Sequence, residues 1–167
     1  MTGISHHREQ EDDMAYERIN RPKGLLYHYT KKDNVESILK DGRIRRFQDR
    51  ECWFCTSLDD TFRLMELTVM QEGKLYYDVY GFPRYYPKFV PEDYVVLELA
   101  PRFQNGDWVI WNQEFPKETP DEVLRLGEEF SHLKKGFRGD LKFYDNPQVY
   151  EVSDFVTEQR KELQMVM

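Results

Sequence analysis

The chain has 167 residues, a formal net charge of −7 and an aromatic content of 15%. That length fits one domain, and the aromatic residues can build a core despite the high charge content. The acidic balance disfavours non-specific binding to nucleic-acid backbones, because no excess of cations is available to displace counterions. No apolar run approaches a membrane span and no secretory signal opens the chain, so we expect a cytoplasmic protein without membrane contacts.

The first elements are an arm and a strand. Residues 1–20 are polar and charged, which predicts a flexible N-terminal arm, and residues 21–167 are expected to form one domain. Leu25–Thr30 is typical of a buried strand. This strand carries His28 among apolar and aromatic residues, and a histidine is costly there unless its ring nitrogens are used.

A short helix is expected next. Val35, Ile38 and Leu39 have the i, i+3, i+4 spacing of an apolar helix face, and Gly42 stands where a left-handed residue ends a helix. An aromatic-rich strand is predicted over 51–57, followed by a helix from Asp59 or Asp60.

Two cysteines, Cys52 and Cys55, form a C-x-x-C pair inside the predicted strand. Three residues apart in a strand, they point to opposite faces. A zinc site would need a second ligand pair, so no metal is expected. We interpret both as reduced structural cysteines, with a redox role as the alternative.

The second half of the chain combines strands with one longer helix. A tyrosine-rich irregular loop is expected over 76–91 and a basic loop, able to hold a phosphate or simply to turn, over 134–139. Two strands without a helix between them argue for an α+β fold over a doubly wound sheet. The strands are predicted over 94–99 and 107–111, as a hairpin, and over 148–152, with a helix from Thr119 to about Lys135.

Three short motifs within residues 24–70 resemble the ADP-ribosyltransferase-like superfamily. They are Tyr27–Thr30, the helix end Ile38–Gly42, and Trp53–Ser57. The closest branch is the His-type one, which includes DarT-like DNA ADP-ribosyltransferase toxins, RNA 2′-phosphotransferases and poly(ADP-ribose) polymerase catalytic domains. The resemblance implies a split β-sheet core with short flanking helices that binds NAD, as substrate, in a cleft between two sheets.

The resemblance also implies roles for individual residues. His28 would hydrogen-bond a ribose of NAD, and Thr30, on the same strand face, would hold the adenosine side, with Tyr29 between them. The nicotinamide would stack on the next strand. Trp53, Phe54 and Ser57 are the candidates there, and the register between them stays open, although Phe54 also suits the core.

The third position of the family is a glutamate at the start of a late strand, which stabilises positive charge as nicotinamide leaves. Gln148 fits that place best but carries no charge. Glu151, Glu98 and Glu114 are the alternatives for this one catalytic role.

Two functions follow from the resemblance. The first is NAD-dependent transfer of ADP-ribose to a protein or nucleic acid, or NAD hydrolysis, in a toxin or phage–host conflict. The second is an inactive relative that acts as a binding or inhibitor module through its tyrosine-rich loop. An unrelated α+β domain with a structural His28 is the plain alternative.

Overall fold

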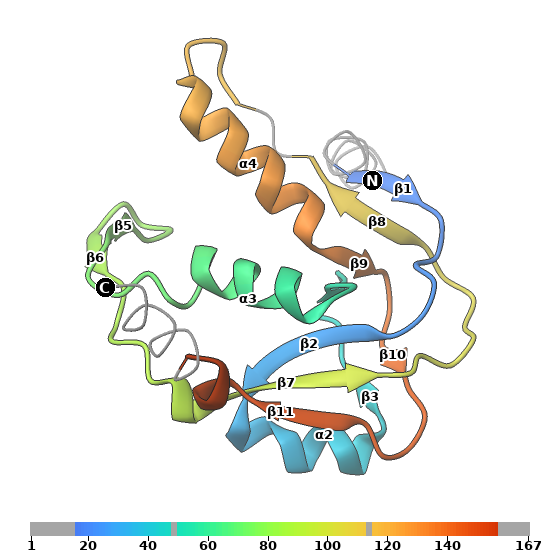
Figure 1. Ribbon diagram of the computed structural model, residues 1–167. Helices are drawn as coiled ribbons and strands as arrows, with labels where there is room; N and C mark the ends of the chain where they lie inside the picture. Colours follow the sequence, from blue (N-terminus) through green and yellow to red (C-terminus); the bar gives the residue numbers. More distant parts are fainter. Residues whose placement is uncertain (1–15, 48–49, 113–114, 157–167) are drawn as a thin grey trace, which may run out of the picture.

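The computed structural model describes residues 16–47, 50–112 and 115–156. The fold is α+β, as predicted, with small antiparallel sheets and helices packed on them (Figure 1). The helices are α2 (Val35–Asp41), α3 (Leu58–Leu67) and α4 (Asp121–Leu133), with 3₁₀ turns η1 (Lys32–Asn34) and η2 (Pro91–Asp93). The strands are β1 (Tyr16–Ile19), β2 (Leu26–Lys31), β3 (Arg43–Ile44), β4 (Cys52–Phe54), β5 (Leu75–Tyr77), β6 (Pro83–Tyr85), β7 (Tyr94–Leu99), β8 (Trp108–Trp111), β9 (Lys135–Phe137), β10 (Leu141–Lys142) and β11 (Gln148–Glu151).

A three-stranded sheet in the order β11-β7-β2 carries His28. All its pairs are antiparallel, and His28 lies opposite Leu97. Because side chains alternate along a strand, Leu26, His28 and Thr30 share the face on which α2 packs. Tyr27 and Tyr29 share the other face, which is covered by α3 (Figure 1). The predicted strands over 25–30, 94–99 and 148–152 are therefore confirmed to within a residue or so.

A four-stranded sheet in the order β1-β8-β9-β4 forms the second layer. The predicted hairpin of β7 with β8 is wrong, because β8 pairs with β1 and β9 while β7 pairs with β2 and β11. The predicted basic loop over 134–139 is also wrong, since it contains β9. Gly136 lets β9 approach β4 closely: a Cβ there would lie 3.0 Å from the Trp53 ring.

The two sheets meet at the edges of β2 and β4, along what we call the seam. One bridge joins them, in which the backbone N–H groups of Tyr27 and Cys55 each donate to the other residue's carbonyl at 2.9 Å. A shared core lies across the seam. Leu26 and Leu97 come from one sheet, and Phe54 and Trp108 from the other. The seam is thus held mainly by side-chain burial.

Two further predictions need correction. The described part of the expected flexible arm, Tyr16–Ile19, is a strand, held because the Tyr16 ring packs on Trp111 at 5.2 Å and its hydroxyl donates to Glu51. Residues 1–15 lie outside the described residues. The tyrosine-rich segment over 76–91 is not irregular throughout: β5 and β6 form a separate hairpin. Its exposed apolar side chains are Leu75, Tyr76, Tyr77, Val79, Tyr80, Phe82 and Tyr85.

The helices begin and end where local chemistry dictates. Gly42 ends α2 in the left-handed region, with φ 70°, as predicted. The second helix begins one residue before the predicted Asp59, and α4 lies within the predicted range. None of the helices in the described ranges is long and apolar enough to cross a bilayer.

Candidate functional site

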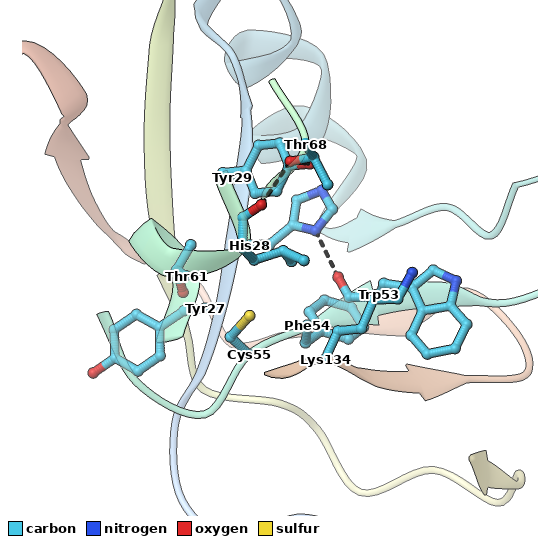
Figure 2. Close-up of a pocket in the computed structure, with 10 residues that line it drawn as sticks. Tyr27, His28, Tyr29, Trp53, Phe54, Cys55, Thr61, Thr68 and Lys134 are labelled. Atoms are coloured by element: carbon cyan, nitrogen blue, oxygen red, sulfur yellow. Dashed lines mark hydrogen bonds between the residues drawn. The ribbon is translucent and has the colours of Figure 1, made fainter. Parts of the chain in front are cut away.

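Two cavities open on either side of His28, where the sheets meet. The first, which we call the seam cavity, has a volume of about 260 Å³ and lies among β2, β4, α3 and the end of α4 (Figure 2). The second, the arginine cavity, has about 230 Å³ and lies between His28, α2 and β3. His28 is the residue that lines both. A ligand that occupied both cavities would therefore contact this side chain.

The imidazole of His28 is oriented by the neighbouring sheet. Its Nδ1 lies 2.9 Å from the carbonyl oxygen of Trp53, and a carbonyl only accepts, so Nδ1 carries the hydrogen. Burial lowers the pKa of His28, against a smaller opposing effect of the Trp53 carbonyl. The ring is therefore neutral near pH 7, and Nε2 is left as a hydrogen-bond acceptor.

Tyr29 and Thr30 have different surroundings. Tyr29 lines the seam cavity, and its hydroxyl lies 3.1 Å from Oγ1 of Thr68, which itself donates to Leu64. The Tyr29 hydroxyl is thus the donor of that pair, and burial raises its pKa. Thr30 shares the strand face of His28, and its hydroxyl accepts from Asn34 at 3.2 Å beside the arginine cavity.

The three candidates on and after the second strand differ in their burial and contacts. Trp53 is half-buried and lines the seam cavity. Phe54 also touches this cavity, but it is 1% exposed and belongs to the shared core, with its ring 5.5 Å from that of His28. Ser57 lies at the start of α3, where its hydroxyl accepts from the backbone N–H of Asp60 at 3.1 Å. Of the three candidates, Trp53 is therefore the half-buried aromatic side chain that lines the seam cavity.

Replacing Ser57 with alanine is expected to destabilise the protein by about 1 kcal/mol, because α3 loses its N-terminal cap. Ligand affinity should stay unchanged, since this hydroxyl serves the helix. Chemical denaturation gives the first quantity and calorimetry the second. Thr56→Ala, at an exposed neighbour, is the matched control. A Ser57 variant with full stability and weaker ligand binding would contradict the capping role.

Lys134 is the site residue that the sequence interpretation missed. It follows α4, and its Nζ lies 4.5 Å from the centre of the Trp53 ring and 4.4 Å from that of Phe130. Burial lowers its pKa, while Glu51 and Cys55 act in the opposite direction. Among the described residues that line the seam cavity, it is the only lysine or arginine. The sequence signal for Lys134 is the basic run 134–139, which contains β9.

The candidate carboxylates lie elsewhere. Glu98 accepts from the hydroxyls of Tyr27 and Tyr150, each at 3.0 Å, and Gln148 lies opposite it on β11. Glu151 pairs with Lys32 at 2.6 Å. These three candidates line neither cavity. The fourth, Glu114, lies outside the described residues.

Asp41 contacts both arginines of the arginine cavity. Asp41 accepts from Nε of Arg45 at 2.8 Å and from Nε of Arg43 at 3.2 Å, and the Arg45 hydrogen bond is the main reason that the pKa of Asp41 is lowered. Arg43 also pairs with Asp140 at 3.4 Å. A guanidinium has five N–H donors, so both arginines retain donors for an anionic ligand group.

The two cysteines are buried and free, in agreement with the structural interpretation. Burial raises the pKa of Cys52 to about 12 and that of Cys55 to about 11. Cys55 lines the seam cavity, yet its thiol stays protonated and is a poor nucleophile. In the described ranges, no three His, Cys, Asp or Glu side chains gather closely enough to hold a metal ion.

Comparisons with protein-family models, curated proteins and solved structures found no match to this chain.

Proposed function

We propose that this protein binds NAD across His28 and is an ADP-ribosyltransferase-like protein that transfers ADP-ribose to a macromolecule. The observation that carries the proposal is the position of His28, between two cavities at the edge where two small sheets meet. The split of the core into two antiparallel sheets supports it, because the resemblance implies a dinucleotide cleft at such a junction.

Each part of NAD has a matching surface in this proposal. Nε2 of His28 accepts a hydrogen bond from a ribose hydroxyl. Arg43 and Arg45 offer donors to the phosphates and the adenosine side in the arginine cavity. Trp53 offers its ring to the nicotinamide in the seam cavity. When the bond from ribose to nicotinamide breaks, its electrons leave with nicotinamide, and a nucleophile of the target attacks the ribose carbon.

Binding without transfer is the second candidate, and the position of the charges favours it. The departing nicotinamide leaves positive charge on the ribose, which a nearby carboxylate stabilises. The seam cavity has Lys134 in its described lining, while Glu98 and Glu151 are engaged elsewhere. The exposed aromatic side chains of the β5–β6 hairpin would then serve as a recognition surface for a protein or nucleic acid.

The test is a calorimetric titration of the protein with NAD, followed by chromatography for released nicotinamide. Binding with release supports transfer or hydrolysis. In that case the release should persist in Glu98→Gln and Glu151→Gln, because these two carboxylates lie outside both cavities. Binding without release supports the second candidate. The absence of binding would overturn the NAD site in both candidates and would leave only recognition through the β5–β6 hairpin.

A further inference from the structure

Lys134 has an unusual setting for a lysine. Its ammonium group lies between two aromatic rings and beside a cavity, and the described residues place no carboxylate in an ion pair with it. Glu51, whose charge raises the pKa of Lys134, is buried outside the cavity lining and accepts from Tyr16 at 2.8 Å. A partly buried cation with few hydrogen-bond acceptors is costly unless a bound anion completes its surroundings.

The hydroxyl groups around the cavity are already engaged as donors. Each has an acceptor within the protein, so Lys134 supplies the charged N–H donors that the described lining leaves for a ligand. The engaged pairs are Tyr27 with Glu98, Tyr29 with Thr68, Thr61 with Ser57, and Thr68 with Leu64.

The charge of Lys134 also affects which ring the seam cavity binds. The nicotinamide ring of NAD is a pyridinium cation, and a like charge in a poorly solvated cavity opposes its binding. A carboxylate on the ring, placed against the ammonium group, adds an attraction at shorter range than the repulsion from the ring nitrogen. The apolar walls formed by Trp53, Phe54 and Leu64 suit a flat ring, and the ammonium suits a group with two negative oxygens.

We therefore propose that the seam cavity selects a dinucleotide whose pyridine ring carries a carboxylate, paired with the ammonium group of Lys134, over one that carries a carboxamide. The proposal rests on the proposed function, because it assumes that the dinucleotide lies across His28. It names Lys134 as a specificity-determining residue.

The experiment compares two probes by calorimetry at one pH and ionic strength. Nicotinic acid adenine dinucleotide carries a carboxylate where NAD carries a carboxamide. We expect it to bind about 10-fold or more tightly than NAD, since a charge-assisted hydrogen bond contributes that order of affinity. In Lys134→Met the preference for the carboxylate should disappear, because an unpaired carboxylate is costly to bury. Lys135→Gln is the control, because the Nζ of Lys135 donates to the carbonyl of His132 instead.

The outcomes test the role of Lys134 and the binding of NAD separately. Equal affinities of the two probes for the wild-type protein would overturn the role of Lys134 and leave NAD binding intact. If thermal unfolding shows that Lys134→Met is folded and the variant still prefers the carboxylate dinucleotide, the role of Lys134 is also overturned. A preference lost equally in Lys135→Gln would assign the effect to general charge. If neither probe binds, both the inference and the proposed function fail.

Discussion

Replacing Phe54 with alanine should lower the free energy of unfolding by about 3–5 kcal/mol. Phe54 is 1% exposed and lies in the core that crosses the seam, with its ring 5.5 Å from His28 and 6.1 Å from Trp108. Removing it leaves a cavity between the two sheets, which cannot collapse without moving both. Urea denaturation followed by tryptophan fluorescence measures the loss.

The matched control is Phe82→Ala, on the exposed turn between β5 and β6. Phe82 is 61% exposed, so its removal should change stability by less than about 0.5 kcal/mol. A loss below about 1 kcal/mol for Phe54→Ala would show that the seam is not held by this core.

Replacing His28 with asparagine should weaken NAD binding about 10-fold or more while the fold persists. An asparagine amide can still donate to the Trp53 carbonyl in place of Nδ1, but it has no atom at the position of Nε2. The variant thus separates the structural bond from the acceptor offered to the ligand. Calorimetry with NAD measures the loss.

His132→Asn provides the comparison, since His132 is exposed on α4 and lines neither cavity beside His28. Unchanged NAD affinity in a folded His28→Asn variant would mean that His28 serves the seam alone. Reduced affinity in both variants would point to an effect that does not depend on the site.

Local sequence patterns predicted the elements that local chemistry determines. The strand carrying His28 and the strand β7 follow from their β-branched and aromatic composition, and the end of α2 follows from Gly42, whose φ of 70° a residue with a side chain rarely adopts. The position of His28 and Trp53 beside one cavity was expected from the resemblance, and the structure brings these two residues together.

The pairing of strands that lie far apart in the sequence could not be predicted from local patterns. The partner of β4 is β9, about 80 residues further on, and a three-residue strand with lysine and glycine has no strong strand signal. Without that pairing, Lys134 looked like part of a basic turn. Two of the four candidates for the catalytic carboxylate, Gln148 and Glu151, lie on β11, yet β9 is the late strand that starts at the seam cavity.

Few hydrogen bonds connect the two sheets, so a ligand that contacts both sheets affects how easily they separate. Backbone hydrogen bonds cross the seam at Tyr27 and Cys55, and the imidazole of His28 adds one more bond to the carbonyl of Trp53. A molecule that contacts both sheets acts as a cross-link that the unfolded chain cannot use, so its binding free energy adds to the resistance of the seam to opening. Amide hydrogen exchange at Tyr27 and Cys55 would then slow in proportion to ligand occupancy.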